Sequence, residues 1–181
     1  MSELLDIVDK NDIVIGQAER DAAHAQGLRI RLVYVWFYTP RGEVILQRRG
    51  AGKASYPNRL VSTVSGHVVA GDSYLEAAVR ETEEETGVQV DPQALRLFAK
   101  VFRRYEQPGY ITDGFRSIFL YEFRSDIDSL TVEAEEGAGF ELWECDTLLE
   151  SLAQHPDNFA PFLQEPINQK LIASIAQGSQ E

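Results

Sequence analysis

Four glutamates occupy five consecutive positions in the segment RETEEETG at 80–87. The surrounding residues predict a helix over about 73–86 that a glycine terminates. Each helical residue advances about 100° around the axis, so Glu81, Glu84 and Glu85 fall on one side. Like charges three or four residues apart destabilise an exposed helix by roughly a few tenths of a kcal/mol per pair, and a hard divalent cation would relieve that repulsion. The segment therefore raises the hypothesis of a carboxylate site for a metal ion.

The same glutamates have a plainer interpretation, because a glutamate-rich helix is usually a solvated face. Arg80 lies one helical turn before Glu84 and is expected to pair with it, which would orient that carboxylate. Glu83 points away from the other three on the helical wheel and is expected to be solvated. The opposite side carries a mostly apolar stripe suited to packing on a sheet, formed by Leu75, Val79, Thr82 and Thr86.

A longer pattern decides between these two interpretations. The residues GHVVAGDSYLEAAVRETEEETGV at 66–88 resemble the Nudix box, the loop-helix-loop signature of Nudix hydrolases. Two positions depart from the signature, since Asp72 stands where the family has glutamate and Thr82 where it has an aliphatic residue. The shorter carboxylate can still cap the helix or carry charge, and the Thr82 hydroxyl is expected to donate to a backbone carbonyl. The residues that match at the right spacing are Gly66, Arg80, Glu81, Glu84, Glu85, Gly87 and Val88.

The resemblance implies both a fold and a reaction. The implied fold is the Nudix α/β/α sandwich with a mixed β-sheet, in the α/β or α+β class. The implied reaction is metal-dependent hydrolysis, in which water cleaves the diphosphate of a nucleoside diphosphate linked to another moiety, or of a similar small organic diphosphate. Mg²⁺ or Mn²⁺ is the implied cofactor. The resemblance assigns Glu81, Glu84, Glu85 and Gly66 to the metal, with Arg80 as their catalytic support.

Residues 5–90 also resemble the Nudix proteins close to isopentenyl-diphosphate isomerase. That isomerase needs a cysteine just before the Gly-His pair of this segment, and the chain has Ser65 there. One metal-binding histidine of the isomerase would align near Ile30, whereas His67 is retained. A serine hydroxyl is a far weaker acid than a thiol, so isomerisation is disfavoured. A non-catalytic sensor of diphosphates on the same fold is a further alternative, although a sensor need not keep every carboxylate.

Other charged residues are candidates for the remaining roles. A general base is expected from the box or from a later loop, where Glu135 and Glu136 are the candidates; a solvated turn explains them at least as well. Cations that follow a predicted strand could hold phosphate oxygens, or could be ordinary surface residues. The substrate-binding candidates are Arg48, Arg49, Lys53 and Gly66, with Arg103 and Arg104 as a weaker pair.

Histidine and aromatic residues are weaker signals. His67 is either a ligand of a second metal ion or, as a lone histidine more often is, a hydrogen-bonded loop residue. The aromatic run at 34–38 could stack on a nucleobase, but alternation along a strand places about half of it in the core. Its members are Tyr34, Trp36, Phe37 and Tyr38.

The elements that must position these residues can be predicted along the chain, which is expected to form one domain over 1–181. Runs of β-branched and aromatic residues indicate strands, and the turn formers between them indicate hairpins. The glutamate-rich helix should begin at Asp72 or Ser73, with Glu76 completing the cap. In chain order we expect a hairpin over 4–20, strands near 30–38 and 43–48, the helix, strands within 95–106, 114–124 and 139–145, and C-terminal helices over about 146–177.

The overall composition limits the possible partners and location. The formal net charge of −12 disfavours a nucleic-acid polymer or an anionic membrane as a partner, so an anionic small molecule must be met by local cations or a metal. No apolar run is long enough to span a membrane, and the start of the chain lacks the pattern of a signal peptide. Cys145 is the only cysteine, which suits a reducing cytoplasm. A homodimer is plausible for the family.

Overall fold

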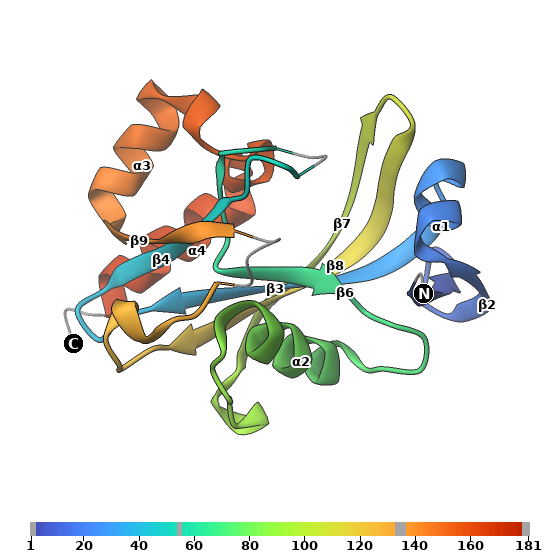
Figure 1. Ribbon diagram of the computed structural model, residues 1–181, viewed down its shortest axis with the longest axis horizontal. Helices are drawn as coiled ribbons and strands as arrows, with labels where there is room; N and C mark the ends of the chain where they lie inside the picture. Colours follow the sequence, from blue (N-terminus) through green and yellow to red (C-terminus); the bar gives the residue numbers. More distant parts are fainter. Residues whose placement is uncertain (1–2, 54–55, 133–136, 179–181) are drawn as a thin grey trace.

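A computed structural model describes residues 3–53, 56–132 and 137–178 of the chain. A mixed seven-stranded sheet lies between helix α2 (Tyr74–Thr86) on one face and helices α3 (Cys145–Gln154) and α4 (Pro166–Gly178) on the other, as Figure 1 shows. This arrangement confirms the predicted α/β/α sandwich with a mixed sheet.

The sheet is organised around strand β3 (Arg29–Tyr38), which is buried on both of its faces. Strand β3 pairs in parallel with β8 along its whole length and antiparallel with β4 and β6. Apolar residues on both faces are expected of a central strand that is covered by helices on two sides. The remaining strands extend the sheet outward, and the strand bounds are β4 (Glu43–Arg49), β5 (Leu60–Val61), β6 (Val64–His67), β7 (Arg96–Gln107), β8 (Tyr110–Glu122) and β9 (Gly137–Glu144).

Local sequence explains two of the connections between strands. The turn between β3 and β4 closes with a hydrogen bond from the Gly42 N–H to the Thr39 carbonyl, and Gly42 has a positive φ of 76° that glycine adopts without strain. The strands predicted near 30–38 and 43–48 therefore agree with β3 and β4. The hairpin between β7 and β8 turns at Gly109, also at positive φ, and extends well beyond the sheet (Figure 1).

Helix α2 begins and ends as the sequence predicts. The Ser73 side chain accepts a hydrogen bond from the Glu76 backbone, and the Glu76 side chain accepts one from the Ser73 backbone, so Ser73 rather than Asp72 is the cap. Gly87 ends the helix in the left-handed conformation. The expected apolar stripe is only partly right, because Leu75 is exposed at the start of the helix whereas Ala77 and Ala78 pack on the sheet.

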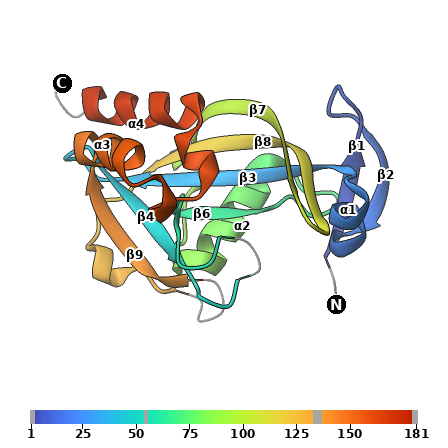
Figure 2. The ribbon, with the colours of Figure 1, turned by 90° about the horizontal axis from the view of Figure 1, so that it is seen from above.

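The N-terminal segment forms a separate small unit beside the main sheet. Strands β1 (Leu4–Val8) and β2 (Val14–Glu19) pair antiparallel, and helix α1 (Arg20–Gln26) follows and ends at Gly27. Apolar residues of β1 and α1, including Leu5 and Ala23, pack against the start of β3. Figure 2 shows α1 beside the far end of the β7–β8 hairpin, and this contact forms one wall of the site described below.

The C-terminal part of the chain covers the face of the sheet opposite α2. Helices α3 and α4 pack together over Trp36, Leu46 and Leu120. No helix in the described ranges has the length and apolar character needed to cross a membrane. Four short 3₁₀ helices complete the structure: η1 (Pro92–Ala94), η2 (Ile127–Ser129), η3 (Pro156–Asn158) and η4 (Pro161–Gln164).

Candidate active site

A cavity of about 600 Å³ opens above β6, between α2, the segment after β4 and the β7–β8 hairpin. It takes residues from almost the whole chain, from Glu3 to Phe162. Three of the glutamates from the acidic helix line it, together with cations from other elements. The charged residues on its wall are Glu3, Glu81, Glu84, Glu85, Arg20, Arg49, Lys53 and Arg116.

The Glu81 side chain of α2 lies directly against Gly66 of β6. A Cβ atom placed on Gly66 would overlap the carboxyl carbon and both oxygens of Glu81. Only glycine at this position therefore leaves room for the Glu81 carboxylate beside the strand. Glu81 is 8% exposed and still lines the cavity.

Burial changes the acidity of this carboxylate. Burial raises the pKa of Glu81 to about 7, and the nearby Glu84 carboxylate acts in the same direction, whereas Arg80 opposes both. A carboxyl group that is partly protonated near neutral pH is a candidate functional group, because the cost of burying its charge is not met by the protein alone. A bound cation would meet that cost.

Arg80 joins α2 to β6 and orients two of the glutamates. Its Nη1 donates to Glu84 Oε2 over 2.9 Å, as the sequence predicts, and lies 3.0 Å from Glu81 Oε1. Its Nη2 donates to the His67 carbonyl over 2.9 Å. Asp72 lies 3.8 Å from Arg80 Nε, so the departure from the family pattern at Asp72 contributes charge near the arginine rather than a helix cap.

The four glutamates of the helix lie in different environments. Glu85 is 6% exposed and accepts a long hydrogen bond of 3.5 Å from Gln47 on β4, whereas Glu84 is about half exposed. Glu83 is exposed and accepts a hydrogen bond from Gln89 outside the cavity. The helix therefore turns Glu81 and Glu85 toward the sheet and leaves Glu83 in solvent, which agrees with the predicted separation of Glu83 from the other three.

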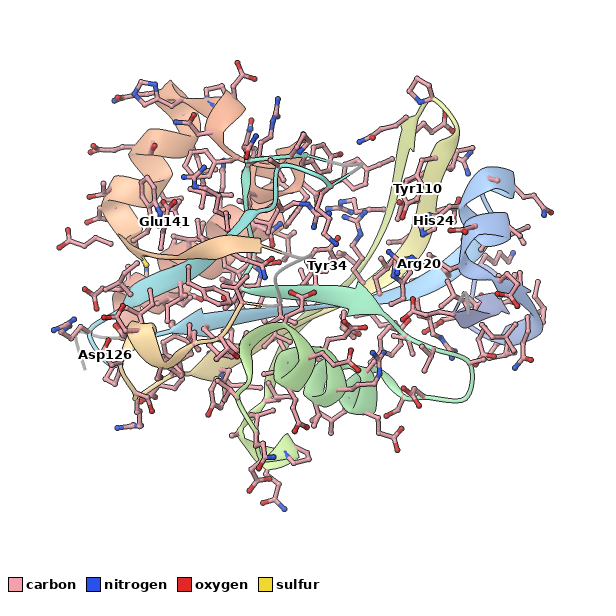
Figure 3. The ribbon with its side chains drawn as sticks, viewed as in Figure 1. Arg20, His24, Tyr34, Tyr110, Asp126 and Glu141 are labelled. Carbon is pink, nitrogen blue, oxygen red and sulfur yellow. The ribbon has the colours of Figure 1, made fainter. Side chains whose placement is uncertain are left out.

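The predicted substrate-binding cations divide between two faces. Arg49 and Lys53 line the cavity. Arg48 does not, because neighbouring residues of a strand point in opposite directions. Its Nε donates to Glu141 on β9 over 2.6 Å, and Glu141 lies away from the cavity residues in Figure 3. Arg48 is therefore not on the cavity wall, and its role in substrate binding stays a prediction. Arg103 and Arg104 also lie outside the cavity wall, where Arg103 pairs with Glu165 and Arg104 pairs with Glu106 and Asp113.

The cavity wall carries a pair of contacting histidines that the sequence analysis did not predict. His67 Nε2 lies 2.9 Å from His24 Nε2 on α1, and the Tyr110 hydroxyl lies 2.9 Å from the same His24 atom. His24 Nδ1 donates to the Ile111 carbonyl over 2.9 Å, which leaves His24 Nε2 as an acceptor with a single lone pair for His67 Nε2 and the Tyr110 hydroxyl. Figure 3 shows His24, Tyr110 and Arg20 together between α1 and the β7–β8 hairpin.

The histidine pair is neutral near pH 7. Burial lowers the pKa of both imidazoles, and it lowers that of His67 well below its ordinary value. His67 is hydrogen-bonded to His24 and lies at the end of β6 rather than in a loop, whereas its alternative role as a ligand of a second metal ion stays a prediction. The sequence signal that could have identified His24 is its place in the last turn of the short helix α1, and this signal is too weak without the fold.

The aromatic run of β3 alternates as expected. Trp36 and Phe37 are fully buried on opposite faces of the sheet, and Tyr38 packs against the α3–α4 side. Tyr34 lines the cavity, where its ring lies 5.0 Å from that of Phe162. Among the cavity residues that the sequence prediction missed are Glu3, Arg20, His24, Tyr105, Gln107, Tyr110 and Arg116.

The residues present suit a hard divalent cation. Among the residues that the structure describes, no three histidine, cysteine or carboxylate side chains already converge on one point. Mg²⁺ does not require such a cage, because it retains several waters and is commonly held by one or two carboxylates together with substrate phosphates. The buried Glu81 and Glu85 carboxylates, which both line the cavity, provide that donor set. Glu135 and Glu136, the predicted general bases, lie outside the described residues.

Comparison with known proteins supports the same family for sequence and fold. The family model described as NUDIX domain matches residues 28–165. An uncharacterised Nudix hydrolase of Streptomyces coelicolor is 50% identical over 96 residues, which are 53% of this chain and 53% of that protein. An uncharacterised Nudix hydrolase of Clostridium acetobutylicum is 29% identical over 81% of this chain and 72% of its own length. The chain thus spans about half the length of the Streptomyces relative.

The fold also matches solved structures. The crystal structure of DR0079 from Deinococcus radiodurans superposes with a TM-score of 0.70, covering 96% of this chain and 99% of that chain. Its sequence identity is 23%, so this likeness concerns the fold alone.

Proposed function

This chain belongs to the Nudix family, and from that premise we propose that it is a metal-dependent hydrolase of small organic diphosphates. A nucleoside diphosphate linked to another moiety is the substrate class that the family suggests. The main observation in favour of the proposal is that two carboxylates, Glu81 and Glu85, line the same cavity as two cations, Arg49 and Lys53. A site for diphosphate hydrolysis needs basic side chains, which bind the phosphate oxygens. It also needs carboxylates, which hold the metal ion that assists hydrolysis.

Each part of this cavity has a proposed role. Glu81, Glu84 and Glu85 hold Mg²⁺ or Mn²⁺, with the Gly66 carbonyl as a further oxygen ligand. When bound, the cation neutralises the diphosphate charge and makes water a better nucleophile. Arg80 keeps Glu81 and Glu84 in place through the hydrogen bonds described above. Arg49 and Lys53 hold the phosphate oxygens of the substrate.

The bond changes follow from hydrolysis of an anhydride. A water oxygen bonds to one phosphorus while the bridging P–O bond breaks, and the bridging oxygen leaves on the other phosphate. The water proton must pass to a base. Glu135 and Glu136 stay predictions for that base. Gly137, the residue that follows them, pairs with the cavity residue Arg49 across β4 and β9, which supports the prediction.

Two alternatives remain from the sequence. Isomerisation of a prenyl diphosphate would need an acid at the position of Ser65, which lines the cavity, and a serine hydroxyl is too weak an acid for that role. A non-catalytic diphosphate sensor would bind the same ligands without cleaving them. Product analysis separates these alternatives from hydrolysis.

The test is a product screen over nucleoside diphosphates, nucleotide sugars, dinucleotides and prenyl diphosphates with Mg²⁺ or Mn²⁺, in water labelled with ¹⁸O. Hydrolysis places the label in a phosphate product. We expect Glu85→Gln to lower kcat by on the order of 100-fold or more, because the amide retains the shape but loses the charge that holds the cation.

The matched control is Glu83→Gln on the same helix, which alters an exposed glutamate outside the cavity and should leave turnover unchanged. Wild-type turnover in Glu85→Gln would contradict the assignment of Glu85 to the metal. Tight, Mg²⁺-dependent binding without any cleavage would favour the sensor.

A further inference from the structure

Arg116 lies on the cavity side of the sheet, across β3 from the end of β6. In the strand register Arg116 is paired with Leu32, and Leu32 is paired with His67. Residues paired across neighbouring strands share a face, and each step between strands is about 4.8 Å, so the Arg116 Cα lies roughly 10 Å from that of His67. Both side chains line the same cavity. Glu81, Glu84 and Glu85 line this cavity as well, so a single extended ligand can reach from them to Arg116.

The guanidinium of Arg116 is almost fully buried and poorly satisfied. The residue is 4% exposed, and its Nε has no hydrogen-bond partner among the described residues. Its guanidinium lies over the rings of Tyr105 and Tyr34, at 4.4 Å and 5.5 Å from their centroids. The Tyr105 hydroxyl is also buried without a partner. Two tyrosine rings thus hold the guanidinium by cation–π contact without using its N–H donors.

The charge of Arg116 is only partly neutralised by the protein. The nearest carboxylate oxygen is Glu165 Oε1, 3.8 Å from Arg116 Nη1, which is beyond hydrogen-bonding distance, and this oxygen has no other partner in the described part of the chain. The other oxygen of Glu165 accepts from Arg103 over 2.8 Å. Two guanidinium groups therefore share one carboxylate, leaving a net positive charge beside the cavity. A buried charge without hydrogen bonds is costly unless a ligand completes its environment.

We propose that Arg116 and the Tyr105 hydroxyl form a subsite for a second oxyanion, a phosphomonoester or a carboxylate, on the organic half of the substrate. The inference rests on the proposed function, because it places the scissile diphosphate at the Nudix glutamates. The planar fork of arginine matches both kinds of oxyanion and binds them through paired hydrogen bonds. A purely apolar organic half, such as a prenyl chain, would leave the buried guanidinium unpaired.

A competing explanation treats Arg116 as a purely structural residue. A side-chain shift of under 1 Å would close the contact between Arg116 and Glu165 into a hydrogen-bonded ion pair, with no need for a ligand. The two explanations differ in one measurable respect. A structural ion pair affects stability and does not distinguish between substrates that differ by one remote anionic group.

The experiment uses two matched pairs of diphosphates, so that the source of the oxyanion is also tested. NADP differs from NAD by one phosphomonoester, and UDP-glucuronate differs from UDP-glucose by one carboxylate. For wild-type protein with Mg²⁺, we expect the anionic member of at least one pair to bind more tightly by on the order of tenfold to a hundredfold, as for hydrogen bonds to a charged group. Calorimetry measures binding, and chromatography of the two phosphomonoester products measures kcat/KM separately.

Variants of Arg116 test whether this residue causes the preference for the anionic ligand. Arg116→Met should abolish it by removing the charge and the donors, and Arg116→Lys should retain part of it, because the charge remains without the fork. The control is Arg103→Met, which removes the other partner of Glu165 outside the cavity wall and should leave the preference intact. A preference that survives in Arg116→Met, or equal binding within both pairs of wild-type ligands, or no binding of any of the four, overturns the proposal.

The binding and cleavage readouts separate the two proposals. Cleavage of both members of each pair at equal kcat/KM would support the hydrolase and refute the subsite. An anionic preference in binding that depends on Arg116, without cleavage of any ligand, would support the subsite and refute the hydrolase.

Discussion

Gly66 and Glu81 show how one residue's missing side chain determines another residue's position. The Glu81 carboxylate lies where any other residue at 66 would carry its Cβ. The spacing between a glycine and the helical glutamates in the sequence therefore has a steric cause in this chain. Arg80 adds the second constraint, because it contacts Glu81 and Glu84 with one nitrogen and the β6 backbone with another.

Gly66→Ala tests this steric relationship. We expect the added methyl group to displace the Glu81 carboxylate by about 1 Å or more, and a displacement of that size lowers catalytic rates by on the order of 100-fold. The measurement is kcat on a cleaved diphosphate together with Mg²⁺ affinity. Gly16→Ala is the control, since a Cβ at Gly16 meets nothing within 4 Å and β2 is exposed. Undiminished Mg²⁺ affinity in Gly66→Ala would show that Glu81 does not need this space.

On helix α2 the residues that pack on the sheet lie directly beside the glutamates that line the cavity. Glu81 and Glu85 lie next to Thr82 and Thr86 on the buried side, because the helix packs across the edge of the sheet that borders the cavity. The expectation that the Thr82 hydroxyl donates to a backbone carbonyl is wrong. Among the described residues the Thr82 hydroxyl is buried and has no hydrogen-bond partner, whereas the Thr86 hydroxyl donates to the Thr82 carbonyl over 2.6 Å.

The two threonines should respond in opposite directions to the same substitution. Thr82→Val replaces an unsatisfied buried hydroxyl by a methyl group and should raise the free energy of unfolding by about 1 kcal/mol. Thr86→Val should lower it by a similar amount, because it removes the hydrogen bonds to the Thr82 carbonyl and from the Val88 N–H. Denaturant unfolding of the metal-free protein measures both. A loss of stability in Thr82→Val would mean that its hydroxyl has a partner in solution, such as water.

The molecule as a whole has a net charge of −12 and places several carboxylates in one cavity, so its stability should depend on pH and on cations. The pKa of Glu81 is raised to about 7, above the ordinary value of 4.5. Between these values the native state binds more protons than the unfolded state. The contribution of Glu81 to stability is therefore fully present below pH 4.5 and is lost as the pH rises through 7.

A divalent cation should reverse that trend, because it binds the ionised carboxylate and competes with the proton. We expect the rise in Tm caused by Mg²⁺ to be small at pH 5.5 and larger at pH 8, with metal affinity falling by up to about tenfold per pH unit below 7. Thermal unfolding with and without Mg²⁺ across this range measures the effect. Glu81→Gln should remove most of the pH dependence. An Mg²⁺ effect that does not vary with pH would exclude Glu81 as a ligand.

The sequence by itself determined the elements and the acidic half of the site. Strand alternation, turn formers and the capping residues of α2 are local signals, and the box motif is contiguous, so they can be recognised along the chain. The fold class, the strands β3 and β4 and the separation of Glu83 follow from such signals, which also limit the cap of α2 to Asp72 or Ser73. For Tyr34, strand alternation predicts two possible faces of the sheet but does not predict which one borders the cavity.

Only the tertiary structure decided the opposite wall of the cavity. His24, Tyr105 and Arg116 lie on α1, β7 and β8, far from the box in sequence, and nothing local marks which residues of those elements will face it. The same limit explains why Arg48 was assigned to the site and Arg116 was not. Adjacent cations on a strand look equivalent in sequence, but the side of the sheet each one faces depends on pairing with distant strands, and that pairing places Arg48 beside Glu141 and Arg116 inside the cavity.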